Sequence, residues 1–323
     1  MDIVRLLLAV DSITTTELIL KTVESRSWPL GTEARILSVV EDAEVPLEVW
    51  KKEGYGVAAV RREMKKRGEQ IASLAVERLH LLGIPTRVVV TRGDPGYLIS
   101  YAARKWKADL ILIRAQNRRD LRNRILGSVA KSVVETTSCS VELVRATDPG
   151  SASQDKLKIL LAVDESNSSI AAAEHVAQTS WRTGTKVNVV SVVNPLIYSL
   201  EEIGLYIDSG TKRAHRAINE AVQSLKSTEL EISAAVVAGR TTKEILKQAK
   251  LWQADLIVVG STNERGLKRI VSPGTSQAVA SRAHCSVRVI RSDSLSKGQA
   301  VKWPFTPSIT YELKREIGLK KAA

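Results

Sequence analysis

Short apolar runs alternate with amphipathic stretches along most of the chain. The runs are apolar at successive positions rather than at every second one, as in Leu6–Val10 and Leu110–Ile113. Strands in a parallel sheet show this pattern because helices bury both of their faces. The stretches between the runs, such as Thr14–Ser25 and Gly96–Trp106, are long enough for helices. The pattern therefore predicts right-handed strand–helix–strand units and a doubly wound α/β fold.

The same order of elements occurs twice. In the first half the pattern predicts strands at 6–10, 34–40, 86–90, 110–113 and 141–144, and helices at 14–25, 56–82, 96–106 and 128–137. In the second half it predicts strands at 159–163, 187–193, 231–237, 256–259 and 287–290, and helices at 168–182, 200–226, 242–251 and 276–282. Each half therefore predicts its own five-stranded parallel sheet.

Residue-level matches indicate that the two halves are copies of one domain. The segment VRLLLAVDS matches LKILLAVDES, KWKADLILI matches LWQADLIVV, and SCSVELVR matches HCSVRVIR. Cys139 and Cys285 lie 146 residues apart, and Asp11 and Asp164 lie 153 residues apart. A period of this length indicates a duplicated domain rather than a solenoid of small units.

Length and composition agree with this organisation. The chain has 323 residues, which suits two domains at about 150 residues each. We expect domains at 1–147 and 157–291, followed by a C-terminal extension at 292–323. No uncharged apolar run approaches the ~20 residues of a membrane-spanning helix, and the N-terminal apolar run is too short for a signal peptide. We therefore expect a cytoplasmic protein with no membrane partner.

Charge and residue types narrow the function classes. The net charge of +13 attracts anions in general but selects none of them. Aromatic residues make up only 4% of the chain, too few for base-stacking platforms, so we do not expect a nucleic-acid partner. The two cysteines and four histidines show no metal-ligand spacing. Walker A and Gly-x-Ser-x-Gly motifs are absent from the sequence, so we expect neither an efficient P-loop ATPase nor a serine hydrolase.

An aspartate follows the first strand of each copy. In a doubly wound sheet, ligands bind beyond the carboxyl ends of the strands, where the strand order reverses. Here we expect that point to be the cleft between the first and fourth strands of each copy. The carboxylates of Asp11 and Asp164 would face this cleft and could accept a hydrogen bond from an adenine amino group or a ribose hydroxyl. Aspartate is also a common helix N-cap, so each could instead cap the helix that follows. Both interpretations stay open at this level.

Several of these segments resemble the universal stress protein family. The resemblance lies in the VDxS-type end of the first strand, the GDP of Gly93–Pro95, the ADLI strand, and SQAVASRAHCSV at Ser276–Val287. It covers nearly all of 4–145 and 157–291. It implies five-stranded parallel sheets of order 3-2-1-4-5 in a tandem member, where the last strands pair the two domains within the chain. Two further partner hypotheses are a homodimer and a protein bound through 292–323.

The nucleotide-binding branch of that family carries a phosphate loop after the fourth strand. Its pattern is Gly, two residues, Gly, nine residues, then Gly-Ser or Gly-Thr. The glycines allow backbone N–H groups close to phosphate, and the final hydroxyl opens a helix. The matching positions are Arg114, Asn117, Gly127 and Ser128 in the first copy, and Gly260, Asn263, Pro273 and Gly274 in the second, where a one-residue shift would use Gly274 and Thr275. Both copies depart from the pattern.

We therefore expect degenerate sites with no tightly bound cofactor, and ATP held only weakly. Arginines in the first loop would make the first copy the better anion site. The resulting hypothesis is a non-catalytic tandem universal stress protein, acting as a cytoplasmic stress-response or signalling module. One alternative is a genuine ATP-binding member with slow hydrolysis. Another is a basic protein associated with anions or nucleic acid.

Overall fold

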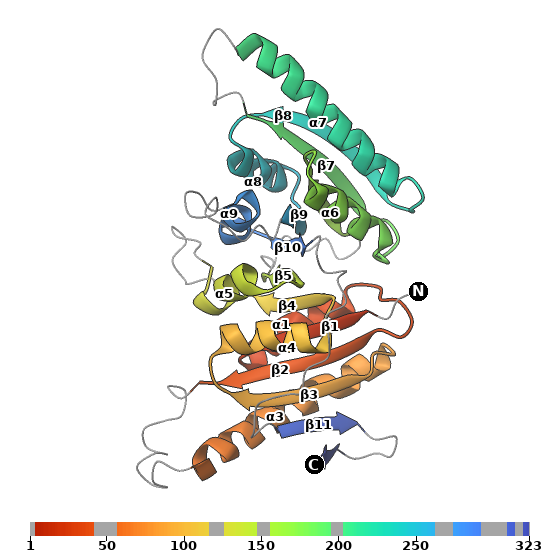
Figure 1. Ribbon diagram of the computed structural model, residues 1–323. Coiled ribbons are helices and arrows are strands. Elements are labelled where there is room, and N and C mark those ends of the chain that lie inside the picture. Colours follow the sequence, from red (N-terminus) through yellow and green to blue (C-terminus); the bar gives the residue numbers. More distant parts are fainter. Residues whose placement is uncertain are drawn as a thin grey trace. The chain divides into compact units, whose positions relative to one another are not determined.

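The computed structural model describes residues 4–41, 57–115, 126–146, 156–194, 203–261, 274–291, 309–313 and 319–322 (Figure 1). The chain divides into two compact units. The first holds Met1–Arg114, Ser128–Cys139 and Ser296–Ala323, and the second holds Ala115–Gly127 and Ser140–Leu295. The predicted domain boundaries fall in or beside residues outside the described ranges and stay a prediction.

The first unit contains a mostly parallel sheet of order β12-β11-β3-β2-β1-β4. Its strands are β1 (Arg5–Val10), β2 (Glu33–Val40), β3 (Thr86–Arg92), β4 (Leu110–Arg114), β11 (Ile309–Leu313) and β12 (Leu319–Ala322). Strand β1 pairs in parallel with β2 and β4, and β2 pairs in parallel with β3. The C-terminal extension adds β11 antiparallel to β3, and β12 antiparallel to β11. These two strands were not predicted from the sequence.

Helices cover both faces of this sheet. Helices α1 (Ile13–Glu24) and α3 (Val57–Leu81) pack together on one face, and α4 (Pro95–Trp106) and α5 (Ser128–Thr136) pack together on the other (Figure 1). The guanidinium of Arg78 on α3 bonds to Glu24 and Glu17 on α1, with Nε–Oε1 and Nη1–Oε2 distances of 2.7 and 2.9 Å. The hydrogen bond to Glu24 contributes most to raising the pKa of Arg78. This ion cluster ties α3 to α1.

The strands of the second unit follow the order β8-β7-β6-β9-β10-β5. The strands are β5 (Ser140–Val144), β6 (Lys158–Ala162), β7 (Lys186–Val193), β8 (Glu231–Ala238), β9 (Leu256–Ser261) and β10 (Ser286–Arg291). All neighbours from β8 to β10 are parallel, whereas β5 runs antiparallel to β10. The second repeat therefore has strand order 3-2-1-4-5, and the first repeat has 3-2-1-4 within its own unit. The predicted doubly wound α/β fold is confirmed.

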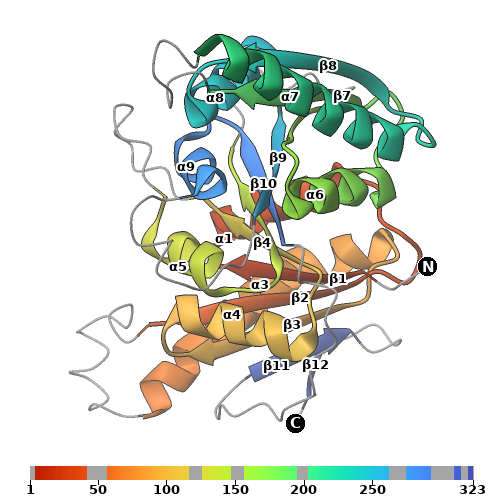
Figure 2. The same cartoon turned by 45° about the horizontal axis from the view of Figure 1, so that its top comes forward.

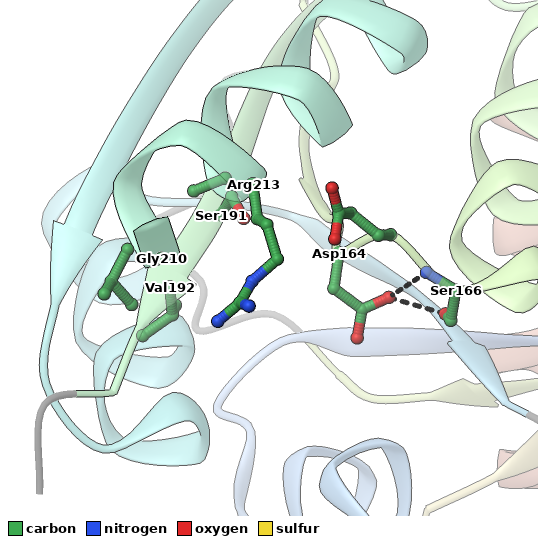
Figure 3. A pocket seen from close by; sticks show the side chains of 9 residues that line it. Asp164, Ser166, Ser191, Val192, Gly210 and Arg213 are labelled. Carbon is green, nitrogen blue, oxygen red and sulfur yellow. Dashed lines mark hydrogen bonds between the residues drawn. The ribbon is translucent and has the colours of Figure 1, made fainter. Parts of the chain in front are cut away.

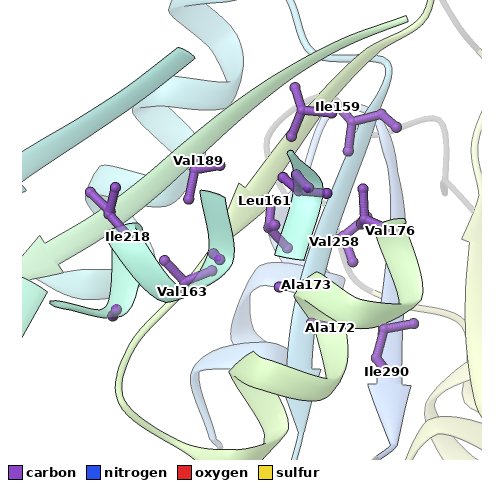
Figure 4. Packing of buried hydrophobic residues seen from close by; sticks show 14 of the residues in the cluster. Ile159, Leu161, Val163, Ala172, Ala173, Val176, Val189, Ile218, Val258 and Ile290 are labelled. Carbon is purple, nitrogen blue, oxygen red and sulfur yellow. The ribbon is translucent and has the colours of Figure 1, made fainter. Parts of the chain in front are cut away.

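The helices of the second unit also lie on two faces. Helices α6 (Asn167–Gln178) and α7 (Ile203–Leu225) pack on one face, and α8 (Thr241–Leu251) and α9 (Thr275–Arg282) pack on the other (Figure 2). Beneath α6 and α7 lies an aliphatic core. Figure 4 shows Leu161 and Val258 of neighbouring strands against Ala172, Ala173 and Val176 of α6. The small alanines let α6 approach the branched side chains of the strands closely.

The aspartate of the ADL motif has a structural role in both repeats. In the second repeat, the backbone N–H of Lys158 donates to Asp255 Oδ2 at 2.9 Å, and the N–H of Asp255 donates to the Lys158 carbonyl at 2.9 Å. Asp109 and Arg5 exchange the same pair of bonds in the first repeat. Burial raises the pKa of Asp255. The motif therefore starts the ladder between the first and fourth strands.

The GDP segment is a helix-start motif. Gly93 adopts φ +141°, a conformation that side chains rarely tolerate. Asp94 is the N-cap of α4, its Oδ1 accepting the N–H of Tyr97 at 2.6 Å, and Pro95 occupies the first turn. In the second repeat Arg240 is the N-cap of α8 and makes no side-chain capping bond.

Among the described residues, no helix is long and apolar enough to cross a membrane.

Replacing Asp94 with alanine should lower the free energy of unfolding by about 1 kcal/mol, because the N–H of Tyr97 loses its acceptor. Replacing Arg240 with alanine is the matched control at the other repeat and should change it by less than about 0.5 kcal/mol. Urea denaturation measures both. Equal effects from the two substitutions would contradict the capping role of Asp94.

Candidate functional site

A cavity of about 270 Å³ opens at the carboxyl ends of β6 and β7 in the second unit (Figure 3). The loop after β6, the end of β7 and one face of α7 form its walls. The lining residues are Asp164, Glu165, Ser166, Ser191, Val192, Val193, Gly210, Arg213 and Ala214. The strand order reverses between β6 and β9, whereas the cavity lies on the β7 side of β6 and has no lining residue from β9. It shares the carboxyl edge of the sheet, where a doubly wound fold binds its ligands, but not the expected crevice between the first and fourth strands.

Asp164 stands at the mouth of this cavity. Its Oδ1 accepts hydrogen bonds from the N–H of Ser166 at 3.0 Å and from the Ser166 hydroxyl at 2.5 Å. Its Oδ2 accepts no hydrogen bond within the described part of the chain. Ser166, not Asp164, is the N-cap of α6 and accepts the N–H of Ser169 at 3.2 Å. The capping interpretation of Asp164 is therefore wrong, and one carboxylate oxygen is available to a ligand.

The opposite wall carries a positive charge. Figure 3 shows the Arg213 side chain of α7 on the other side of the cavity from Asp164, with its guanidinium turned toward Val192. Ser191 is buried near the end of β7 and adds a hydroxyl to the lining. Glu165 at the rim pairs with Arg216 of α7 at 3.2 Å, which ties the loop after β6 to this helix. The cavity thus presents a carboxylate and a guanidinium to whatever enters it.

In the first repeat, Asp11 also follows the first strand and is exposed. Its Oδ1 accepts the Ser12 hydroxyl at 2.9 Å. Ser12 is the N-cap of α1, because its Oγ accepts the N–H of Thr15 at 3.2 Å. Asp11 is therefore not the cap either, and it holds the cap serine as Asp164 does.

The residues aligned with the phosphate loop are only partly brought together. Gly260 lies within β9, Arg114 ends β4, and Gly274 is the N-cap of α9 without a side-chain bond. Thr275 and Ser128 begin α9 and α5, and Gly127 precedes Ser128. None of these residues lines the cavity. Asn117, Asn263 and the other loop arginines lie outside the described residues, so the preference of anions for the first repeat stays a prediction.

Close packing of α6 on β9 explains why residue 260 is a glycine. A Cβ at this position would lie 2.2 Å from the carbonyl oxygen of Ser168 and 2.7 Å from the N–H nitrogen of Ser169. Glycine therefore lets the first turn of α6 rest directly on β9. At the matching position of the first repeat, Arg114 reaches Thr15 of α1, with an Nη1–Oγ1 distance of 3.5 Å. The two repeats have different contacts at the same place.

Of the nine lining residues, only Asp164 was predicted from the sequence. Ser191 could have been noticed as a polar residue inside the apolar run VNVVSVVN. Gly210 and Arg213 carry no such signal, because they lie on a long helix whose orientation follows from packing on β7 and β8. Within the described ranges, no group of three His, Cys, Asp or Glu side chains could hold a metal ion.

A family model described as the Universal stress protein family matches residues 3–145 and 157–291. The chain belongs to this family. A universal stress protein of Methanocaldococcus jannaschii is 28% identical over 142 residues, covering 42% of this chain and 81% of the relative. One from Mycobacterium tuberculosis is 24% identical over 187 residues, covering 57% of this chain and 62% of the relative. The chain thus spans less than two thirds of that longer relative.

A solved structure supports the same fold. A universal stress protein from Archaeoglobus fulgidus superposes with a TM-score of 0.58 at 19% identity, covering 89% of this chain and 96% of that one. At this identity the similarity shows the fold alone. A tandem universal stress protein fold is therefore established on sequence and on structure.

Substituting Gly260 with alanine should lower the free energy of unfolding by about 1–3 kcal/mol, because the new methyl meets the backbone of Ser168. Gly274→Ala is the matched control from the same aligned loop, since the nearest atom to its added Cβ is the Ser276 hydroxyl at 3.9 Å. Thermal unfolding without ligand measures both. A Gly260→Ala chain as stable as wild type would contradict the packing role.

Proposed function

We propose that this tandem universal stress protein is a non-catalytic binding module of the cytoplasm, serving stress response or signalling. In this proposal the second repeat takes a nucleoside or mononucleotide, weakly, in the cavity beside Asp164. The observation that carries the proposal is the cavity itself. It lies at the carboxyl ends of β6 and β7, and both Asp164 and Arg213 line it.

The two charged walls suit different parts of such a ligand. The Asp164 carboxylate accepts hydrogen bonds, which fits an amino group or a ribose hydroxyl. The Arg213 guanidinium donates, which fits a phosphate oxygen. The cavity of about 270 Å³ is just below the range of about 300–1,000 Å³ common for small-molecule sites. This volume favours a single nucleoside unit over a larger cofactor.

Weak binding of phosphates follows from the residues aligned with the phosphate loop. Gly260 keeps the first glycine of the pattern, but Asn263 replaces the second, Pro273 has no N–H to donate, and Gly274 has no hydroxyl. Each lost charge-assisted hydrogen bond to phosphate costs about 1.5–3 kcal/mol. Two losses weaken binding by about 10²–10⁴-fold. ATP should therefore gain little over a mononucleotide.

The residue types around the cavity support a binding role rather than a catalytic one. Its lining holds the hydroxyls of Ser166 and Ser191 but no histidine or cysteine to act as a base or thiolate nucleophile. Both cysteines are buried, and Cys139 donates its thiol to the Ala108 carbonyl at an Sγ–O distance of 3.0 Å. These thiols lie outside the cavity lining.

Calorimetric titration of the full-length chain with AMP tests the proposal. We expect a dissociation constant well above micromolar, and ATP with Mg²⁺ should bind no more than about tenfold tighter. Asp164→Asn should weaken AMP about tenfold, because the charge-assisted bond becomes a neutral one. Asp11→Asn is the matched control in the first repeat and should leave the affinity unchanged.

Other results would favour a different function. Submicromolar ATP binding would favour the genuine ATP-binding alternative. Loss of AMP binding on Asp11→Asn but not on Asp164→Asn would place the ligand in the first repeat. Tight binding of an oligonucleotide that falls steeply with salt would favour the anion-associated alternative.

A further inference from the structure

The ladder between β5 and β10 joins the last strands of the two repeats. It is antiparallel and lies within the second unit. Its central pair is Glu142 opposite Arg288, flanked by Leu143 opposite Val287 and Val141 opposite Val289. Both central residues are almost fully buried, with side chains 0% and 1% exposed. A charged pair therefore occupies the middle of an otherwise apolar ladder.

This pair sits on a local twofold axis. Glu142 and Arg288 occupy the same place in SCSVELVR and HCSVRVIR, 146 residues apart. Because they face each other, the residues on either side of them are paired symmetrically about this point. The flanking bonds obey the same symmetry, because the N–H of Arg145 donates to Ser286 Oγ at 3.1 Å and the N–H of Arg291 donates to Ser140 Oγ at 3.2 Å. The central pair breaks the symmetry chemically, with one acid and one base.

The central pair is tightly bonded. Arg288 Nε donates to Glu142 Oε2 at 2.9 Å, and Nη2 lies 2.8 Å from the same oxygen. Nη1 lies 2.9 Å from Nε2 of His175 on α6, and the guanidinium stacks 5.2 Å from the Trp181 ring. A buried charge that loses its partner is strongly destabilising. The identity of the facing residue therefore decides whether this ladder can form.

Symmetry gives the central position a second consequence. Suppose that β5 of one chain paired with β5 of a second chain, or β10 with β10, in the register seen here. Glu142 would then face Glu142, or Arg288 would face Arg288. Both pairings bury like charges without compensation. A neutral residue at this position would permit pairing between two copies of the chain, because an exposed strand edge readily pairs with the same strand of another molecule.

We infer that Glu142 and Arg288 are a specificity device for strand pairing. They direct the last strand of the first repeat onto the last strand of the second repeat, and they bar either strand from pairing with its own counterpart in a second copy of this chain. The inference concerns assembly and does not depend on any ligand in the cavity.

Charge reversal in the full-length chain tests this inference. Glu142→Arg and Arg288→Glu should each lower the unfolding midpoint by about 10 °C, since each buries two like charges. The double variant Glu142→Arg/Arg288→Glu restores opposite charges and should recover at least half of the loss. Glu231→Lys is the matched control, because Glu231 faces Lys186 across β7 and β8 in a half-exposed pair. It should shift the midpoint by no more than ~2 °C.

Mixing the two single variants tests partner choice directly. The Glu142→Arg chain carries arginine at both central positions, and the Arg288→Glu chain carries glutamate at both. When the two are co-refolded, either last strand of one chain therefore finds the opposite charge on the other chain. We expect native mass spectrometry of two differently tagged chains to show a heterodimer, whereas neither variant dimerises with itself.

Three outcomes would overturn the inference. The first is that the single variants are as stable as the Glu231→Lys control. The second is a double variant that recovers none of the lost stability. The third is recovery in the double variant without heterodimers in the mixture, since the pair would then stabilise the ladder without selecting partners.

Discussion

The first strand of each repeat pairs in parallel with a neighbour on each side, and this pairing decides on which face each helix of the repeat lies. Strand β6 has β7 on one side and β9 on the other, all parallel, and β1 has the same relation to β2 and β4. Each connection must then cross over the sheet, and crossovers to the two sides lie on opposite faces. At the carboxyl edge of the sheet, the two crossover connections therefore diverge and leave an open space between them. In the second unit this edge holds Asp164 and the cavity beside it.

The sequence predicted this frame because its signals are local. Runs of successive apolar residues identified all ten strands of the two repeats, and the position after the first strand identified Asp164. It missed β11, because that strand lies outside the repeats and depends on a distant partner, β3. It could not decide between a ligand role and a capping role for Asp164. Ser166 is also a suitable N-cap residue, and only the backbone conformation shows which of the two caps α6. The position of Arg213 at the cavity depends on how α7 packs on the sheet, and no local sequence pattern predicts that packing.

The two repeats keep one frame and differ in the contacts that hold it. Gly260 brings α6 onto β9, whereas the matching Arg114 reaches Thr15 of α1. Asp94 caps α4, whereas Arg240 makes no capping bond at α8. Glu142 and Arg288 differ in sign at equivalent places and bond to each other. A duplicated domain can diverge in this way because each repeat no longer has to be complementary to a copy of itself.

A crystal structure of the full-length chain soaked with AMP would locate the ligand. We expect a nucleotide in the second unit, with a donor of its base or ribose hydrogen-bonded to Oδ2 of Asp164 and its phosphate beside Arg213. We also expect the Oδ1 bonds to Ser166 to persist, since they hold the loop that forms the wall. A nucleotide bound beside Asp11 while the cavity of the second unit holds none would contradict a ligand site at Asp164.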